Sequence, residues 1–308
     1  MKYYYLYNPF DKLHTIFVNS LLYTIYDVGD NGKEIKEWNE VENFKNEYDE
    51  IVLIYIAHPI YLYKNQKVNH FIQNINQKKN IKKILYIMEP LTDIQTRILY
   101  KRIIRTCHIR NIWTYSKGNM KYIENILPNI QLKSVIKMVV MSPYYNDFIN
   151  WRFQMNIEKD MNKIVFIGNV TEMRRNKLER IQREMTEKGL QKEIEIITDR
   201  YEINDWKWIV NRYQYFINIH RIDGCLNLET FRIYLLLGNG CIVFSECIGE
   251  DEIEEYMDTN LYVSNIDNMV NQMICVMDKS VDEIEDRYVH YKMKNMRELW
   301  INVNMKKK

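Results

Sequence analysis

The feature that most constrains this chain is an alternation of apolar strand-like segments with helical segments, which occurs twice along the sequence. Runs such as IVLIYIA (51–57) and KIVFIGN (163–169) are apolar almost throughout, without the polar alternation of a strand that has one face in water. Strands buried on both faces occur in parallel sheets covered by helices. The pattern therefore predicts an α/β chain built on parallel sheets.

The alternation is interrupted once, by an aromatic and less periodic stretch over 142–162. Each run has enough strands for a sheet of its own, which predicts two doubly wound Rossmann-like domains facing a cleft. We expect the domains over 1–150 and 151–280, with a terminal helix within 281–308 that returns to the first. Strands are expected at 3–8, 51–57, 82–89, 111–116 and 133–141, and then at 163–169, 193–198, 215–220, 241–246 and 261–265. Helices are expected at 14–25, 65–77, 95–106 and 117–127, and then at 174–189, around 206–213, at 227–237 and at 267–277.

Composition excludes several classes of protein. The 308 residues are 46% hydrophobic, which is enough for a folded core. There are 43 Lys and Arg and 41 Asp and Glu, so the net charge is only +2 and gives no reason to expect nucleic acid as a partner. The basic stretch over 97–110 is interpreted as a solvated helix face. The five cysteines show no CxxC spacing, and no apolar run approaches the length of a membrane span. These observations predict a cytoplasmic protein without a membrane span. The abundance of Asn, Ile, Lys and Tyr is typical of AT-rich genomes, viral ones included.

Ligands of doubly wound sheets bind at the carboxyl ends of the strands, so the residues that follow each strand are the candidates for a site. The strand 163–169 ends with a turn at Gly168, and Arg174, Arg175 and Lys177 follow at the start of a helix, where basic side chains could neutralise phosphate. Surface helices often carry such charges, so by themselves they are better explained as solvated. Gly168 is the only glycine there, and the absence of GxGxxG disfavours a nicotinamide or flavin dinucleotide. After His220, a loop leads to Glu229 near the start of the next helix. By position alone, Glu229 is better explained as complementing the helix dipole than as a ligand of a ribose diol.

Several segments resemble one family in order and spacing. Three stretches of the second half are similar to the donor half of GT-B glycosyltransferases of the group-1-like kind. They are KIVFIGN, then YFINIH followed by DGCLNLETFRIYLLLGNGCIVFSE, and then YMDTNLYVSNIDNMVNQM. In the first half, IWTYSKGNMKYI and MSPYY resemble the same enzymes. The resemblance covers about 163–277 well and the first half loosely. It implies a nucleotide-sugar donor site in the second half.

Carried over residue by residue, the resemblance places Gly168 and Asn169 beside the donor diphosphate and Arg174 among its ligands. Glu229 would hold the ribose, with His220 nearby. The remaining implied donor residues are Asp199 and Arg200 near the base, and Gly224, Cys225, Leu226 and Asn227 around phosphate. The sequence departs from the paired carboxylates of retaining families, because Arg221 stands eight positions before Glu229. It also has no DxD motif, so a metal-independent reaction with a UDP- or GDP-sugar as co-substrate is expected.

Transfer to a hydroxyl acceptor benefits from a general base, and in this family the acceptor side is the first half. His58 and Glu89 follow predicted strands, and each precedes a proline that holds it extended. Asp11, in the loop after the first strand, ranks behind them. A lone His or Glu at a strand end is more often a capped or solvated group than a catalyst.

The resemblance implies a hexosyltransferase-type glycosyltransferase acting on a glycan, lipid or protein hydroxyl. Two alternatives stay open. The same fold could glycosylate DNA bases, for which the basic stretch over 97–110 is the only support. The chain could also be a sugar-nucleotide-binding module without catalysis.

Overall fold

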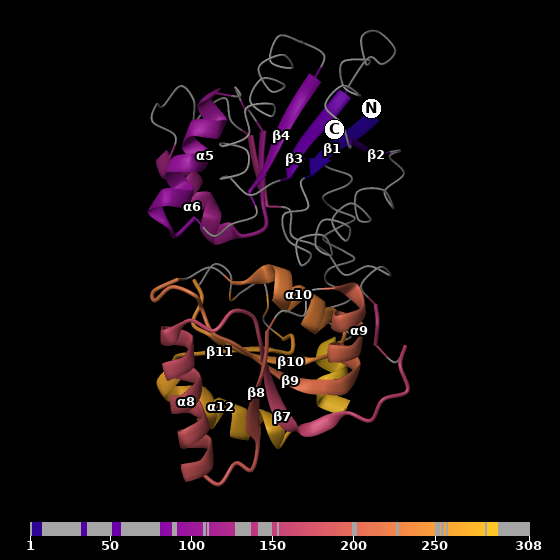
Figure 1. The fold of residues 1–308 in the computed structure, drawn as a ribbon, viewed down its shortest axis with the longest axis vertical. Helices are drawn as coiled ribbons and strands as arrows, with labels where there is room; N and C mark the ends of the chain where they lie inside the picture. The colour runs from indigo at the N-terminus through magenta and orange to yellow at the C-terminus, as the bar shows by residue number, and fades with distance from the viewer. Residues whose placement is uncertain are drawn as a thin grey trace. The chain divides into compact units, whose positions relative to one another are not determined.

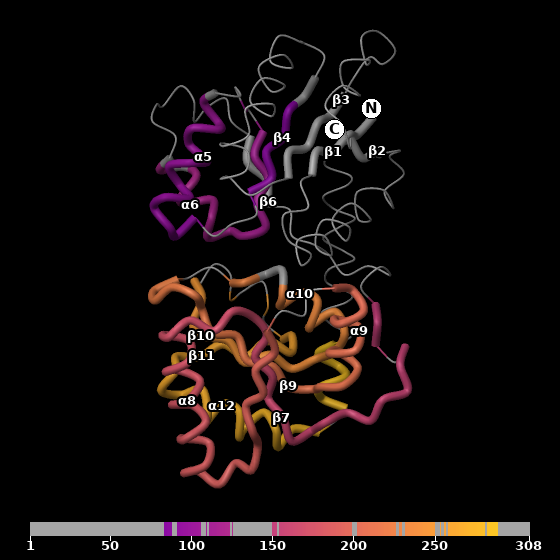
Figure 2. Tube along the Cα trace, viewed as in Figure 1, coloured from indigo at the N-terminus to yellow at the C-terminus, as the bar shows by residue number. Residues whose placement is uncertain are grey.

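The structure is a computed structural model in which two compact units divide the chain, Met1–Pro143 and Tyr144–Lys308. It describes residues 2–7, 32–35, 51–56, 81–87, 91–106, 109, 111–126, 137–140, 150–152, 154–198, 202–225, 228–249, 253, 256, 258–280 and 282–288. Figure 1 labels the helices and strands, and Figure 2 follows the same chain as a tube.

The first unit contains a six-stranded parallel sheet with the strand order β2-β1-β3-β4-β5-β6. The strands are β1 (Lys2–Tyr7), β2 (Gly32–Ile35), β3 (Ile51–Ile56), β4 (Ile81–Ile87), β5 (Asn111–Thr114) and β6 (Lys137–Val140). The helices α5 (Ile94–Thr106) and α6 (Lys117–Ile126) follow β4 and β5 and pack against each other. The predicted helices over 14–25 and 65–77 lie outside the described residues.

The strand β2 was not expected from the sequence. Its residues, GKEI, have little apolar character, because β2 is the outermost strand and pairs with β1 alone. An edge strand is exposed on one side, so it does not need the continuous hydrophobic run that reveals a central strand. The other five strands of this sheet overlap the predicted ranges.

The second unit has a five-stranded parallel sheet with the order β11-β10-β9-β7-β8. Its strands are β7 (Asp160–Ile167), β8 (Glu193–Ile197), β9 (Tyr213–Asn218), β10 (Ile242–Glu246) and β11 (Leu261–Ser264). Its helices are α8 (Glu172–Glu187), α9 (Ile203–Arg212), α10 (Thr230–Gly238) and α12 (Ile266–Met277). The strand order reverses between β7 and β9, which makes their carboxyl ends the topological switch point of the sheet.

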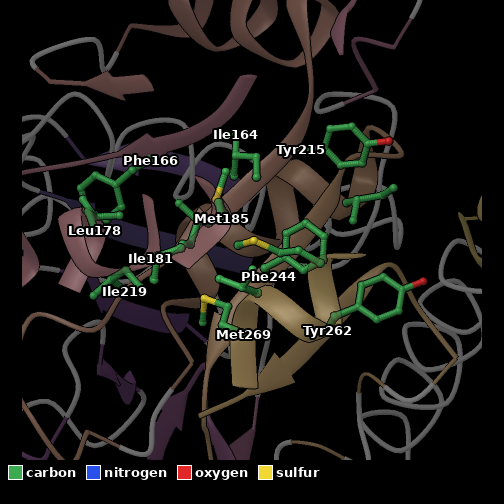
Figure 3. Packing of buried hydrophobic residues seen from close by; sticks show 14 of the residues in the cluster. Ile164, Phe166, Leu178, Ile181, Met185, Tyr215, Ile219, Phe244, Tyr262 and Met269 are labelled. Atoms are coloured by element: carbon green, nitrogen blue, oxygen red, sulfur yellow. The ribbon is translucent and has the colours of Figure 1, made fainter. Parts of the chain in front are cut away.

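The strands β9 and β10 and the second half of β7 are buried on both faces of the second sheet, which explains their apolar residues. Ile164 and Phe166 of β7 face a cluster formed with Leu178 and Ile181 of α8 and Met269 of α12 (Figure 3). Residues one position along each strand point to the other face, where α9 and α10 lie (Figure 1). None of the described helices has the length and apolar content to cross a membrane.

The segment that enters the second unit is fixed to it by buried hydrogen bonds. Trp151, which is 2% exposed, donates its backbone N–H to Asn239 Oδ1 at 2.8 Å, and its carbonyl accepts from Asn211 Nδ2 at 2.8 Å. The next residue, Arg152, makes a bidentate ion pair with Glu285 at 2.9 and 2.6 Å. The Arg152 guanidinium also lies over the Tyr288 ring.

Residues 282–288 form the described part of the predicted terminal helix, and they contact the second unit. Arg287 donates to the Thr259 carbonyl at 3.0 Å, and Asn260 Nδ2 donates to the Ile284 carbonyl at 3.0 Å. Residues 289–308 lie outside the described residues. The return of this helix to the first unit therefore stays a prediction.

Candidate functional site

The candidate site lies where β7 and β9 end, at the switch point of the second sheet. Gly168 follows β7 with a φ of +137°, a conformation that side chains rarely tolerate, and its N–H donates to the Ile197 carbonyl at 3.0 Å. His220 follows β9 and is buried. The chain then crosses an exposed loop and enters α10.

Glu229 is the centre of the site. It occupies the N-cap position of α10 with φ −76° and ψ 67°, and its side chain makes no cap hydrogen bond. Arg174 Nη2 donates to one carboxylate oxygen at 2.6 Å, and Arg232 Nη2 forms an ion pair with the other at 2.8 Å. The carboxylate is therefore held between two guanidinium groups.

The charge of Glu229 is stabilised despite its burial. Burial alone would raise the pKa of the Glu229 carboxyl, but attraction to Arg232 and Arg174 outweighs it and holds the pKa below its ordinary value. Burial lowers the pKa of Arg174, and the charge of Glu229 opposes that effect. Each group thus favours the ionised form of the other.

Arg174 connects three elements. Its Nε donates to the Ile219 carbonyl at 2.9 Å after β9, and its Nη1 donates to the Asn169 carbonyl at 3.0 Å after β7. With Nη2 on Glu229, the guanidinium spans the ends of both strands and the start of α10. The sequence interpretation made Arg174 a phosphate ligand, a role that stays a prediction. In this structure its hydrogen bonds lie within the protein and position Glu229.

Arg232 was not among the candidate site residues chosen from the sequence. It lies in the first turn of α10, three residues after Glu229, and its Nη1 donates to Asn218 Oδ1 at 3.2 Å. A Cβ atom on Gly168 would lie 3.0 Å from Arg232 Nη2. The (i, i+3) spacing from Glu229 on a predicted helix was the signal that could have identified it.

His220 has an unused ring nitrogen. Its Nε2 lies 3.1 Å from the Cys247 carbonyl, so the neutral ring donates from Nε2 and leaves Nδ1 as an acceptor. Nδ1 is buried and has no hydrogen-bond partner among the described residues. A ligand hydroxyl or N–H could supply the missing donor.

A second ion-pair group supports the loop after His220. Glu246, at the end of β10, accepts from the His220 backbone N–H and from Lys177 Nζ, both at 2.6 Å. Lys177 Nζ also donates to Asp223 at 2.7 Å. Burial disfavours the charge on Lys177, but the hydrogen bonds with Asp223 and Glu246 outweigh it and raise its pKa. The sequence interpretation counted Lys177 among the basic residues that could neutralise phosphate, and that role stays a prediction.

The other predicted donor residues fall into two groups. Gly224 has a φ of +70°, and Cys225 is buried in the loop before α10. The remainder lie outside the described residues, namely Asp199, Arg200, Leu226 and Asn227, together with the acceptor-side candidates Asp11, His58 and Glu89. The helix begins at Thr230 rather than at 227, because Glu229 has a non-helical backbone. The donor-binding roles of all these residues stay predictions.

The group formed by Arg174, Arg232 and Glu229 carries one net positive charge, because two guanidinium groups contact a single carboxylate. The N-terminus of α10 adds the partial positive charge of a helix start. An anionic ligand is the expected complement. No group of three or more His, Cys, Asp or Glu side chains suited to a metal ion occurs among the described residues.

Comparison with solved structures identifies the fold as GT-B. HepE of Anabaena in complex with UDP-glucose matches with a TM-score of 0.60 at 8% identity, over 99% of each chain. T4 phage BGT in complex with UDP and Mn²⁺ matches with a TM-score of 0.56 at 12% identity, over 97% of each chain. Sucrose-phosphate synthase of Thermosynechococcus elongatus matches with a TM-score of 0.53 at 10% identity, over 99% of this chain and 97% of that one. No family model and no curated protein sequence matches the chain.

The contact between Gly168 and Arg232 predicts an unusually costly glycine substitution. Gly168→Ala should lower the free energy of unfolding by about 2–3 kcal/mol, because it adds backbone strain and also displaces the Arg232 guanidinium. Gly189→Ala is the matched control: Gly189 also has a positive φ, of +76°, but a Cβ there meets nothing within 4 Å. Its cost should be about 1 kcal/mol. Equal losses in urea denaturation would show that Arg232 does not pack on Gly168.

The lowered pKa of Glu229 predicts how pH affects stability. Because its folded-state pKa lies below the ordinary value of 4.5, the carboxylate stabilises the fold above that pH and loses this effect as pH falls through the folded pKa. At pH 7, Glu229→Gln should cost about 3 kcal/mol, since it leaves the buried Arg174 and the half-buried Arg232 without their counter-ion. The difference from wild type should shrink progressively below pH 4.5. A pH-independent difference in urea denaturation would contradict the ion-pair assignment.

Proposed function

We propose that this protein is a glycosyltransferase that moves a sugar from a UDP-sugar to a hydroxyl acceptor. The observation that carries the proposal is the pairing of Glu229 with Arg174 and Arg232 beside Gly168, at the switch point of a sheet in a GT-B fold. UDP is favoured over GDP because HepE and T4 phage BGT were each solved with a uridine nucleotide.

The ionised Glu229 suits a ribose diol. A carboxylate offers about four lone-pair positions, and the contacts with Arg174 and Arg232 occupy two of them. The remaining positions can accept hydrogen bonds from two hydroxyl groups. Because both oxygens are already fixed by guanidinium groups, the acceptor atoms are oriented before the nucleotide arrives.

The diphosphate would lie between Arg232, the start of α10 and the backbone at Gly168. Gly168 carries no side chain that could block the approach of phosphate. A helix start is also a favourable place for an anion, because of its partial positive charge. In the reaction, the acceptor oxygen bonds to the anomeric carbon as the bond from that carbon to the diphosphate oxygen breaks. UDP leaves with the bonding electrons, and the positive groups stabilise the charge that develops on it.

The acceptor hydroxyl must lose its proton during the transfer. We place the base in the first unit, at His58 or Glu89, with Asp11 as the third candidate, because only groups on the acceptor side can reach that proton. We also propose that no metal is required, since Arg174, Arg232 and the helix start supply positive charge. The T4 phage structure contains Mn²⁺, which makes metal dependence the first property to measure.

The acceptor is a separate question. A structure of a DNA-modifying β-glucosyltransferase matches at 11% identity, which relates the folds and leaves the acceptor open. A glycan, lipid or protein hydroxyl is proposed, with a DNA base as the alternative. Turnover of UDP-glucose would exclude the non-catalytic alternative. We place the enzyme in the cytoplasm, and the free cysteines among the described residues support this location. One of them, Cys241, stays protonated because burial raises its pKa to about 11.

Nucleotide binding gives the sharpest test of the role of Glu229. Glu229→Gln should weaken UDP binding by about 1–3 kcal/mol, because the amide cannot accept two charge-assisted hydrogen bonds from the ribose. Inorganic pyrophosphate should bind the variant at least as tightly as wild type, because removing the carboxylate increases the positive charge of the site. Calorimetry with both ligands checks this. Equal weakening for both would mean that Glu229 only maintains the fold.

Catalysis should continue without a divalent ion. In EDTA, transfer or hydrolysis of UDP-glucose should keep most of its rate, because side chains and a helix start stabilise the leaving diphosphate. The assay is release of UDP, with His58→Ala and Glu89→Gln compared alongside wild type to locate the base. Loss of activity in EDTA, with recovery on adding Mg²⁺ or Mn²⁺, would show that a metal takes part.

A further inference from the structure

One aromatic side chain of β7 lies against both arginines of the donor site. The guanidinium of Arg174 lies over the Phe166 ring, with its central carbon 5.3 Å from the ring centroid. The guanidinium of Arg232 lies over the same ring at 5.8 Å. Both distances fall within the range of about 6 Å in which a cation is attracted to an aromatic face. A single ring therefore faces the two cationic groups that hold Glu229.

The core fixes the position of this ring. Phe166 is fully buried, and Figure 3 shows it beside Leu178 of α8, within the cluster that covers one face of the second sheet. A close-packed side chain keeps one orientation. Two residues later, Gly168 leaves room for the Arg232 guanidinium, because a Cβ atom there would lie 3.0 Å from Nη2. The end of β7 thus offers Arg232 a ring face and an adjacent gap.

The two arginines need such support because they repel each other. Burial has the largest effect on the pKa of Arg174 and lowers it, the charge of Glu229 opposes this effect, and the charge of Arg232 lowers the pKa further. Glu229 compensates for only one of the two positive charges. The face of an aromatic ring carries partial negative charge, so a ring beside both guanidinium groups reduces the cost of keeping them together.

We propose that Phe166 is a positioning residue for the donor nucleotide. Its ring fixes the places of Arg174 and Arg232, and these arginines orient the carboxylate oxygens of Glu229 that receive the ribose. Because Phe166 is fully buried, it acts through these groups and not by contact with the nucleotide. The inference rests on the proposed function, since it assigns the site to a nucleoside diphosphate.

A role in the core alone is the alternative, and Phe244 provides the comparison. Any large side chain buried in this cluster stabilises the fold, so a loss of stability in a Phe166 variant does not distinguish the two roles. Phe244 is fully buried in the same cluster. Its ring packs against that of Tyr262, with the centroids 6.0 Å apart. Phe244→Leu therefore removes the same atoms from the same core without removing a ring from the arginines.

The first test measures UDP affinity by calorimetry. Phe166→Leu removes the ring face and should weaken UDP binding about tenfold. Phe166→Tyr keeps a ring and should retain most of the affinity. Phe244→Leu should destabilise the protein to a similar degree but bind UDP as wild type does. If Phe166→Leu does not fold, Phe166→Met takes its place, because methionine fills the space without offering a ring.

The second test needs no ligand. Urea denaturation compares the effect of Phe166→Leu in wild type with its effect in Glu229→Gln. Without the carboxylate the arginines are no longer held together beside the ring, so Phe166→Leu should lower the denaturation midpoint less in Glu229→Gln than in wild type. Phe244→Leu should lower the midpoint equally in both backgrounds.

The outcomes separate this inference from the proposed function. Wild type that does not bind UDP would overturn the proposed function. Wild type that binds UDP, together with equal affinity in the Phe166→Leu and Phe244→Leu variants, would overturn this inference alone. The inference also fails if Phe166→Leu lowers the denaturation midpoint equally in wild type and in Glu229→Gln.

Discussion

The second unit depends on one buried guanidinium group. Arg174 hydrogen-bonds the backbone carbonyls that follow β7 and β9, and its remaining nitrogen holds Glu229 at the start of α10. Parallel strands that end side by side leave carbonyl groups pointing at the sheet edge, where they need donors. A charged side chain with donors in a fixed planar arrangement satisfies two of them and places a carboxylate with the third. The geometry of the site thus follows from satisfying the strand ends.

The same arrangement explains why a carboxylate is tolerated at a place suited to anions. Glu229 would repel a diphosphate if it stood alone, but Arg174 and Arg232 leave the group as a whole positively charged. The carboxylate can then act through its acceptor oxygens while the arginines and helix start determine the sign of the local field. Burial strengthens the hydrogen bonds to the carboxylate oxygens and the field of the arginines and helix start, because water screens these interactions less.

The sequence allowed the fold and part of the site to be predicted, for reasons visible in particular residues. The central strands β3, β7 and β9 each contain an apolar run, which is typical of parallel strands, so their positions could be predicted, and the resemblance of the surrounding segments implied the GT-B fold. The edge strand β2 carries no such signal. Gly168 and Glu229 could be chosen because strand ends and helix starts are local features. The partners Arg232 and Lys177 could not be ranked above other surface charges, because their contacts with Glu229 and Glu246 exist only after the strands are assembled.

The ion pair between Arg152 and Glu285 affects the order of events during synthesis. Arg152 belongs to the first residues of the second unit, and Glu285 lies 133 positions later in the chain. The first unit contains its own sheet within Met1–Pro143 and can assemble while the rest is still being translated. The second unit cannot finish in this way, because Arg152 lacks its partner until residue 285 has left the ribosome. The first unit can therefore fold as it emerges, whereas the second gains this contact only after residue 285 has been made.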